Sequence, residues 1–382
     1  MNKKIKIIAD DKIPFLKGVL EPFASIEYLN YSQITNEKLK DVDALLIRTR
    51  TKCNKELLEG TRVKFIATAT IGFDHIDTKY CDEKNIKWLN APGCNSGSVM
   101  QYFASAILSL AHKKNISLKD KTLGIIGVGN VGSKVERFAK TIGMKVLLND
   151  PPRERVEGKD KFVSLDELIS KSDIITFHVP LNKEGDDKTF HLADKNFFNK
   201  FDEQKIIINT SRGEVIDTSA LKEAIEEEKI SFLVLDVWEN EPNIDIDLLS
   251  KTDIATPHIA GYSADGKANG TSICVNALSD FFNLGLEKNW YPKEIPAPNN
   301  SSLIEIDCSN KSEQEIIFDV INHTYKIYDD DFRLRNSVQS FEKQRANYPI
   351  RREFHYYTLK LKNVYTSLQE IFMNLGFNLE QK

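Results

Sequence analysis

The chain has 382 residues, of which 41% are hydrophobic and 28% are charged. This composition can bury a large core, which excludes an intrinsically disordered chain, and the length predicts two or three domains of roughly 100 to 200 residues each. The 52 basic and 56 acidic side chains give a formal net charge of −4. The chain therefore lacks the positive field with which proteins hold nucleic acids or anionic membranes, and we expect neither as a partner.

The cysteine pattern favours a reducing compartment. The chain contains an odd number of scattered cysteines without a Cys-x-x-Cys pair: Cys53, Cys81, Cys94, Cys274 and Cys308. We therefore expect no metal site, and reduced thiols favour a cytoplasmic protein. The basic N-terminus resembles the start of a signal peptide, but Lys6 interrupts its apolar run and Asp10 ends it, so we expect a strand there.

Short apolar runs alternate with helix-length amphipathic stretches. The predicted strands are residues 5–9, 44–47, 65–68, 122–126, 145–148, 174–177, 206–209, 232–235 and 254–256. These runs are rich in Ile, Val, Leu and Phe and do not alternate with polar residues, which is typical of parallel strands covered on both faces. The sequence therefore predicts an α/β protein with two Rossmann-like domains built on parallel sheets.

Two breaks divide the chain. A predicted helix at 98–112 and a loop at 113–121 separate the first strands from the second set, and a segment with three prolines, 290–300, follows later. The remainder predicts a small α+β module. Its strands are expected at 302–306 and 356–361, and its helices at 313–325 and 364–375.

A glycine motif lies between the strand at 122–126 and a helical pattern at 133–142: Gly127, Val128, Gly129, Asn130, Val131 and Gly132. In a dinucleotide-binding turn, the first glycine permits a tight turn and the second lets backbone NH groups approach a pyrophosphate. The third glycine lets helix and strand pack closely, and the helix N-terminus stabilises the negative charge. A glycine turn that binds no cofactor is the weaker alternative.

Asp150 ends the following strand, eighteen residues after Gly132. A carboxylate at this place accepts hydrogen bonds from the adenosine ribose and repels a 2′-phosphate, so the sequence favours NAD over NADP. Arg153 lies close behind and is able to pair with such a phosphate, but two prolines intervene. A cap of the turn before the prolines is the alternative role for Asp150.

Arg212, Glu241 and His258 follow three successive predicted strands of the second half. Ligands of an open parallel sheet collect at this edge. Oxidation of an alcohol needs a base for the hydroxyl proton, which histidine supplies near neutral pH, and an adjacent carboxylate orients the ring. Arginine binds a substrate carboxylate with its planar fork. Each residue alone is more often structural, but their order downstream of the glycine motif is specific.

The chain resembles the D-isomer-specific 2-hydroxyacid dehydrogenases. Members share the glycine motif, the Arg-Gly pair, the Asp-Val-x-x-x-Glu-Pro motif and the Pro-His pair. Further strings extend the resemblance to one branch of this family over essentially all 382 residues: Arg48 to Lys52, Thr68 to His75, Ala91 to Asn95, Asp236 to Trp238, His258 to Tyr262 with Gly266-Lys267, Asn347-Tyr348, and Arg351 to Glu353.

The resemblance implies roles residue by residue. Arg212 and Glu241 are then catalytic, and His258 is the proton donor or acceptor. The implied substrate-binding residues are Thr49, Thr70 and Tyr262, and the implied further NAD contacts are Val179, Asp236 and Gly261. Thr49 stands where the family has serine and keeps the hydroxyl, whereas Val179 replaces a hydroxyl-bearing residue and offers only backbone and apolar contact. Turn capping by the threonines and plain packing of Tyr262 are the alternatives.

The resemblance also implies a domain plan. We expect a substrate-binding domain at 1–97 and 258–286, an NAD-binding domain at 98–257 and a C-terminal dimerisation domain at 287–382. The implied reaction is NAD-dependent oxidation of a phosphorylated hydroxyacid by a homodimer. Two alternatives remain: an enzyme of the same family that acts on 3-phosphoglycerate and has a ligand-sensing tail, and an NAD-sensing binding protein on the same fold.

A phosphorylated hydroxyacid carries a second anionic group, and Arg212 is able to neutralise only one. Arg48 and Arg50 flank Thr49, and the C-terminal segment contains Arg345, Arg351 and Arg352. Because arginine suits bidentate phosphate contacts, we expect some of them at the phosphate, with the C-terminal arginines acting across a dimer. Ion pairing of the C-terminal arginines with Glu342 and Glu353 is the alternative.

Overall fold

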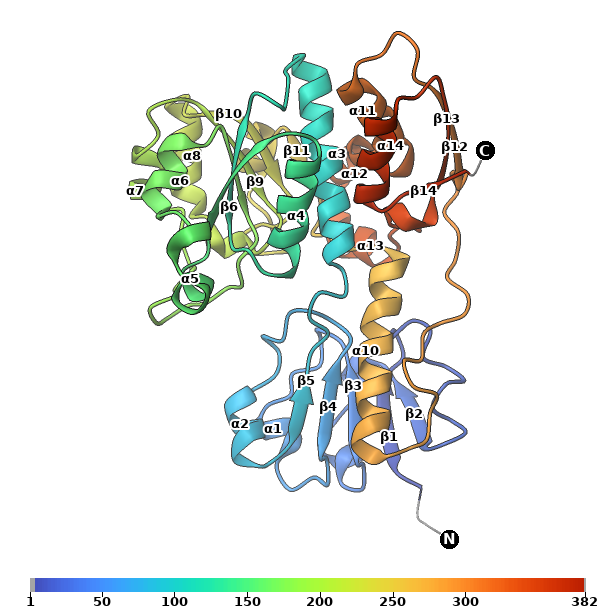
Figure 1. Ribbon diagram of the computed structural model, residues 1–382. Coiled ribbons are helices and arrows are strands. Elements are labelled where there is room, and N and C mark those ends of the chain that lie inside the picture. Colours follow the sequence, from blue (N-terminus) through green and yellow to red (C-terminus); the bar gives the residue numbers. More distant parts are fainter. Residues whose placement is uncertain (1–3, 381–382) are drawn as a thin grey trace. The chain divides into compact units, whose positions relative to one another are not determined.

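The computed structural model describes residues 4–380, which form three sheets whose strands are all parallel (Figure 1). The chain divides into two compact units. The first comprises the described residues up to Asn95 together with Ser263–Pro296, and the second comprises Ser96–Tyr262 together with the described residues from Ala297 onward. The predicted α/β class with parallel sheets is confirmed. Within residues 4–380, no helix combines the length and apolarity that a bilayer crossing requires.

The sheet of the first unit has the strand order β2-β1-β3-β4-β5. Its strands are β1 (Lys6–Asp10), β2 (Ser25–Leu29), β3 (Ala44–Ile47), β4 (Phe65–Thr68) and β5 (Lys87–Leu89). Its helices are α1 (Lys55–Leu58), α2 (Thr78–Glu83) and α10 (Ala264–Phe282). The sequence does not predict β2 and β5, because these edge strands are largely exposed or half-buried and lack a continuous apolar run.

The larger sheet of the second unit has the order β11-β10-β9-β8-β6-β7. Its strands are β6 (Thr122–Ile126), β7 (Lys145–Asn149), β8 (Ile174–Phe177), β9 (Lys205–Asn209), β10 (Ile230–Leu235) and β11 (Ile254–Ala255). The helices of this part are α3 (Ser96–Lys114), α4 (Asn130–Thr141), α5 (Pro151–Glu157), α6 (Leu165–Lys171), α7 (Lys195–Asn199), α8 (Thr218–Glu226) and α9 (Ile246–Lys251). The strand order reverses between β6 and β8, so a ligand is expected at the C-terminal ends of these two strands.

The C-terminal segment forms the third sheet, in the order β12-β13-β14. Its strands are β12 (Leu303–Asp307), β13 (Thr358–Lys362) and β14 (Asn378–Leu379), and its helices are α11 (Glu313–Thr324), α12 (Ile327–Asn336), α13 (Phe341–Ala346) and α14 (Thr366–Leu375). The predicted strands and helices are present. The charged stretch between them also forms helices, α12 and α13, which bury Leu334 and Phe341. Single-turn 3-10 helices lie at Tyr31–Gln33, Glu37–Leu39, Lys159–Lys161, Gly213–Val215, Val338–Ser340 and Phe354–Tyr356.

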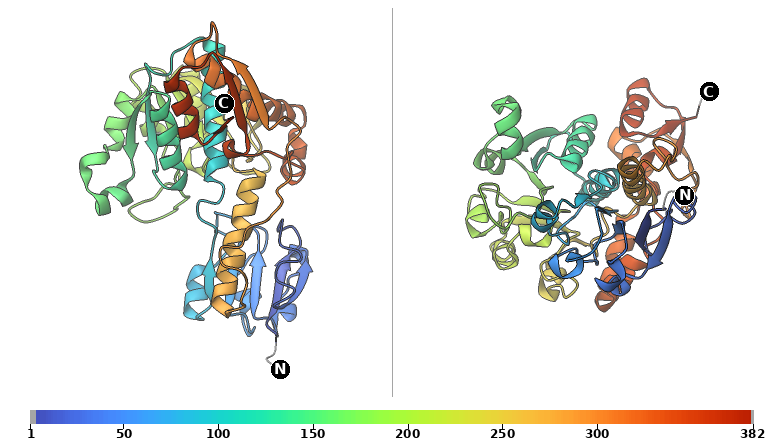
Figure 2. Two further views of the ribbon diagram at one scale, coloured as in Figure 1. Left: turned by 45° about the vertical axis from the view of Figure 1, so that its right-hand side comes forward. Right: turned by 90° about the horizontal axis from the view of Figure 1, so that it is seen from below.

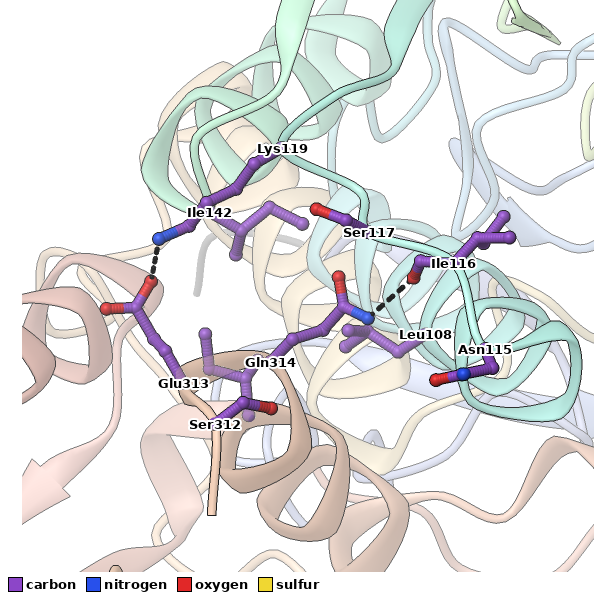
Figure 3. A pocket seen from close by; sticks show the side chains of 10 residues that line it. Leu108, Asn115, Ile116, Ser117, Lys119, Ile142, Ser312, Glu313 and Gln314 are labelled. Carbon is purple, nitrogen blue, oxygen red and sulfur yellow. Dashed lines mark hydrogen bonds and ion pairs between the residues drawn. The ribbon is translucent and has the colours of Figure 1, made fainter. Parts of the chain in front are cut away.

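The C-terminal segment and the larger sheet of the second unit share one hydrophobic core. Ile316 and Val320 of α11 belong to the same buried cluster as Phe103 and Ile107 of α3. Helices α11 and α12 lie beside α3, as Figure 1 and Figure 2 show. Figure 3 shows a pocket at the edge of this contact, where the Gln314 side chain donates to the Ile116 carbonyl at 2.9 Å. Because of this shared core, the C-terminal segment belongs to the second unit.

Candidate active site

The glycine motif forms the turn between β6 and α4. Gly127 has a φ of +87°, and a Cβ there would lie 2.7 Å from the carbonyl oxygen of His178. A Cβ on Gly132 would lie 2.1 Å from the Gly127 carbonyl oxygen, so both positions require glycine for packing. A Cβ on Gly129 would meet nothing within 4 Å. The space beside Gly129 is therefore open at the start of α4, where Asn130 and Val131 form the first turn.

Asp150 connects this turn to α5. Its Oδ2 accepts the Val128 NH at 2.7 Å, and its Oδ1 accepts the Arg153 NH at 3.0 Å as the N-cap of α5. The capping role is thus present, but an ionised carboxylate has about four lone-pair sites and retains acceptors for ribose hydroxyls. The Arg153 side chain pairs with Glu157 at 2.6 Å. This ion pair reduces the ability of Arg153 to bind a 2′-phosphate.

His178 and Val179 follow β8 on the other side of the switch point. A Cβ on Gly127 would lie 2.7 Å from Val179 Cγ1, so the valine forms an apolar wall of the turn. The His178 ring bonds to the hydroxyls of Thr176 at 3.0 Å and Thr210 at 3.3 Å. Burial lowers the pKa of His178 to about 3, which makes this histidine too weak a base for proton abstraction near neutral pH.

The predicted catalytic residues lie on three loops at one edge of the sheet. Arg212 follows β9, Glu241 follows β10 and His258 follows β11, and these strands are parallel neighbours. A Cβ on Gly213 would lie 2.0 Å from the Trp238 carbonyl carbon, so the loops of Arg212 and Glu241 pack backbone to backbone. Gly213 is the glycine of the Arg-Gly pair, and this close packing gives it a structural role that the sequence alone does not indicate.

Glu241 and His258 form a hydrogen-bonded pair. His258 Nδ1 lies 2.7 Å from Glu241 Oε2, and Glu241 Oε1 accepts the Trp238 NH at 2.9 Å. Burial alone would raise the pKa of the Glu241 carboxyl, but the hydrogen bond and charge of His258 outweigh that effect. The Trp238 NH and the positive charge of Arg345 act in the same direction, so the pKa of Glu241 lies below its usual value. The pair therefore holds a carboxylate against Nδ1 and leaves Nε2 for proton transfer.

The loop that follows His258 is held by Asp236. This carboxylate is 1% exposed and accepts the Ile259 NH at 2.8 Å, the Ala260 NH at 2.9 Å and the Thr256 hydroxyl at 2.6 Å. The Asp236 carbonyl accepts the His258 NH at 2.7 Å. Asp236 thus positions the loop of His258 and the half-buried Gly261, and its predicted contact with NAD stays a prediction.

Tyr262 lies beside two residues of the C-terminal segment. Its ring packs edge-to-face on Tyr348, with centroids 5.8 Å apart, and the Arg345 guanidinium lies 5.8 Å from the Tyr262 ring centroid. Arg345 also pairs with Glu342 at 2.9 Å, as the ion-pair alternative predicts. The charge of Arg345 also lowers the pKa of Glu241, so this guanidinium lies near the Glu241 carboxylate of its own chain.

The other C-terminal arginines do not fit the expected phosphate role. Arg351 is 4% exposed and donates to the carbonyls of Ile259 and Ala260 in its own chain. Arg352 is also buried, and its guanidinium lies 4.2 Å from the Tyr356 ring centroid. The expectation that these two side chains extend to a partner's substrate is wrong, because burial and contacts within the chain occupy them.

The predicted substrate residues of the first unit lie at the C-terminal edge of its sheet. Thr49 is exposed after β3, and Thr70 follows the neighbouring strand β4. The Thr70 hydroxyl donates to the Gly72 carbonyl at 3.0 Å, so the turn-capping alternative is present for this residue. Arg48 donates to the Lys12 carbonyl at 3.3 Å, and Arg50 lies over the Tyr31 ring at 5.4 Å.

Comparison with known proteins places this geometry in a family. A family model described as the NAD binding domain of D-isomer specific 2-hydroxyacid dehydrogenases matches residues 103–260. A protein named erythronate-4-phosphate dehydrogenase, from Bacteroides thetaiotaomicron, is 52% identical over 93% of this chain and 99% of its own length. The chain belongs to the D-isomer-specific 2-hydroxyacid dehydrogenases. The predicted resemblance is confirmed, and this dehydrogenase is an oxidoreductase with NAD as its cofactor.

Other relatives of this 2-hydroxyacid dehydrogenase support the same family assignment. A protein of the same name from Proteus mirabilis is 38% identical over 99% of this chain and 100% of its own. The D-lactate dehydrogenase of Aquifex aeolicus, solved with NAD and lactic acid, has a TM-score of 0.59 and 30% identity over 76% of this chain and 100% of its own. An NAD-bound 3-phosphoglycerate dehydrogenase of Entamoeba histolytica has a TM-score of 0.61 and 25% identity over 77% of this chain and 100% of its own. Residues 298–376 match a separate family described only as a domain of unknown function.

Two glycine substitutions are expected to separate cofactor binding from folding. Gly129→Ala adds a Cβ that meets nothing within 4 Å, so the melting temperature should stay unchanged while the Kd for NAD rises about tenfold, the loss of roughly 1.4 kcal/mol of binding. Gly132→Ala places a Cβ 2.1 Å from a carbonyl oxygen and should cost about 1–3 kcal/mol of unfolding free energy. Calorimetric NAD titration and thermal unfolding measure both effects. Unchanged NAD affinity in Gly129→Ala would contradict the binding role of this turn.

Proposed function

We propose that this enzyme is an erythronate-4-phosphate dehydrogenase, which oxidises 4-phospho-D-erythronate with NAD. The products are (R)-3-hydroxy-2-oxo-4-phosphooxybutanoate and NADH, in the biosynthesis of pyridoxal 5′-phosphate. The relatives with this name support the substrate, since they match over nearly the whole chain. The observation that supports the chemistry is the 2.7 Å contact between His258 and Glu241, which lie after neighbouring strands of the NAD-binding domain.

The chain's own residues supply the acid–base chemistry. His258 Nε2 takes the proton of the C2 hydroxyl, and the Glu241 carboxylate at Nδ1 stabilises the resulting imidazolium. Arg212 binds the substrate carboxylate with its guanidinium fork. NAD, when bound, supplies the acceptor for the hydride that leaves C2. In the reverse direction, protonated His258 returns the proton to the carbonyl oxygen.

The residues of the glycine turn fit NAD. Gly127 and Gly132 occupy positions that a Cβ would block, and Gly129 borders open space at the start of α4. We assign the pyrophosphate to Gly129, Asn130 and Val131 and the adenosine ribose to Asp150. Val179, Asp236 and Gly261 complete the proposed NAD contacts.

Arg345 is the best placed of the C-terminal arginines to bind the substrate phosphate. Its Nε is buried and has no hydrogen-bond partner among residues 4–380, and its guanidinium lies over the ring of Tyr262. A buried donor without a partner is costly, and an anionic ligand would satisfy it. We propose that Arg345 and Tyr262 bind the phosphorylated substrate from the second unit. For Thr49, Thr70 and the arginines beside Thr49, the substrate-binding role is proposed from the family resemblance alone.

We further propose a domain plan and an assembly. Residues 1–97 and 258–286 bind substrate, residues 98–257 bind NAD, and residues 287–382 join two copies into a homodimer. The last quarter of the described chain contains several large exposed apolar side chains, among them Phe332 at 69%, Met373 at 53% and Ile350 at 46% exposure, which a second copy would cover. A cytoplasmic location agrees with the five cysteines, none of which forms a disulfide within residues 4–380.

A substrate panel tests the proposed function. NADH formation should be fastest with 4-phosphoerythronate and much slower with 3-phosphoglycerate or with unphosphorylated D-2-hydroxyacids. A preference for 3-phosphoglycerate would favour the other enzyme of this family. Binding of NAD without turnover of any of these acids would instead favour an NAD-sensing protein.

Substitution of the catalytic pair tests the base. His258→Ala should lower kcat by about 10²- to 10⁴-fold, the usual effect of a general base, while the Kd for NAD stays unchanged. Glu241→Gln should shift the pH profile of oxidation to lower pH, because a neutral amide no longer stabilises the imidazolium. The Glu241 pKa lies below its usual value, so this carboxylate is ionised across the profile. An unchanged kcat in His258→Ala would refute the assignment.

Arg345→Ala tests the phosphate contact. The KM for 4-phosphoerythronate should rise roughly 10- to 100-fold, since a hydrogen bond to a charged group contributes about 1.5–3 kcal/mol. The KM for NAD should not change. Lys343→Ala, which removes an exposed cation from the same helix, is the matched control. Equal effects of the two substitutions would show that only the general charge of α13 matters.

A further inference from the structure

Arg351 of the C-terminal segment lies against the loop that follows the proposed catalytic base. Its Nη2 donates to the Ile259 carbonyl at 3.2 Å and to the Ala260 carbonyl at 2.5 Å. The NH groups of the same two residues donate to the buried Asp236 carboxylate at 2.8 and 2.9 Å. The peptide groups next to His258 are therefore held from both sides, by an anion at the NH groups and a cation at the carbonyls.

The loop requires restraint by these hydrogen bonds because His258 has an unfavourable backbone conformation. Its φ is +56°, in the left-handed region that a residue with a Cβ adopts only at a cost. A conformation of this kind persists when its surroundings restrain it. The restraint also sets the direction of the imidazole, whose Nδ1 must meet Glu241 at 2.7 Å.

The burial of Arg351 is costly and demands an explanation. The residue is 4% exposed, and its Nε has no hydrogen-bond partner among residues 4–380. Its guanidinium lies 4.4 Å from the ring centroid of Tyr325 and 5.6 Å from that of Tyr348. An apolar side chain of the same volume would pack between these rings without desolvating a charge. The arginine differs from such a side chain in its hydrogen bonds, which are a long one to the Tyr348 hydroxyl at 3.5 Å and the two shorter ones that it donates to the loop.

The neighbours of Arg351 fix the segment independently of its guanidinium. The Arg352 carbonyl accepts a hydrogen bond from the Gln101 side chain at 3.0 Å. The Glu353 carboxylate accepts the Ser98 hydroxyl at 3.0 Å at the start of α3. A change of the Arg351 side chain is therefore expected to leave this segment in place.

We propose that Arg351 is a positioning residue for His258, so that the C-terminal segment completes the catalytic site of its own chain. This role rests on the proposed function of His258 as the base. It differs from dimerisation and from phosphate binding, because it acts within one chain and through the base. The segment thereby affects the rate of proton transfer as well as the association of two copies.

The test uses Arg351→Lys and Arg351→Gln in the full-length enzyme. Both side chains keep a hydrogen-bond donor but lose the guanidinium fork, so His258 should lose its fixed direction. The kcat for oxidation of 4-phosphoerythronate should fall about 10- to 100-fold, since a displacement of about 1 Å is able to cost 10²-fold in rate. The Kd for NAD should change much less than kcat, because Gly261 is only one of the proposed NAD contacts. The pH profile should shift because the contact between His258 and Glu241 is disturbed.

Arg335→Lys is the matched control. Arg335 is another arginine of the C-terminal segment that donates to two backbone carbonyls, those of Leu249 at 2.9 Å and Thr252 at 2.5 Å. It also pairs with Asp331 at 3.0 Å. Its loss should lower the melting temperature as much as Arg351→Lys does, but leave kcat and the pH profile unchanged.

A double-mutant cycle with His258→Ala separates the possible outcomes. If Arg351 acts through His258, then Arg351→Lys should have no further effect on kcat in the His258→Ala background. Wild-type kcat and pH profile in both Arg351 variants, with His258→Ala impaired, would overturn the inference and leave the proposed function intact. If the losses of kcat from the two substitutions added up in the double variant, the inference would be overturned too. Full activity of His258→Ala alone would instead overturn the proposed function.

Discussion

The hydrogen bond between His258 and Glu241 depends on the register of neighbouring parallel strands. β10 pairs with β11 so that Leu235 lies opposite Ala255, and the two loops leave the sheet at the same height. The Asp236 carboxylate then accepts NH groups of the second loop, and the Trp238 NH binds the Glu241 carboxylate. A slip of one residue would turn these side chains to the other face of the sheet and separate the pair.

The same edge of the sheet also organises the proposed cofactor site. The strand order reverses between β6 and β8, and the loops after these strands contain Gly127 and Val179, which lie so close that a Cβ on Gly127 would clash with the valine. Close packing at this point excludes side chains at Gly127 and Gly132, whereas Gly129 is bordered by open space. The three glycines thus serve different purposes, and only Gly129 is free of a packing constraint.

The C-terminal segment has a closer relation to catalysis than its sequence indicates. Its helices share a core with α3, and two of its arginines lie near the catalytic residues of the same chain. Arg345 is near Glu241 and Tyr262, and Arg351 contacts the loop after His258. Both guanidiniums are held by contacts within the chain, among them the ion pair of Arg345 with Glu342.

The sequence alone was sufficient to predict the parallel sheets, the glycine turn and the three catalytic candidates. Buried parallel strands are continuous apolar runs, and β9, β10 and β11 each precede one of these candidates. The edge strands β2 and β5 were not predictable in this way, because their residues are mostly exposed or half-buried. Nor were the helices α12 and α13, whose charged residues conceal the buried Leu334 and Phe341.

The roles of the C-terminal arginines were decided only by tertiary structure. In the sequence, Arg345 and Arg351 are equivalent cations in a charged stretch, and both are candidates for a substrate phosphate. Folding buries Arg351 against the carbonyls of Ile259 and Ala260, about ninety residues earlier in the chain, and places Arg345 over Tyr262. Contacts over such separations depend on how helices pack on a distant loop, and no local pattern of residue types encodes that packing.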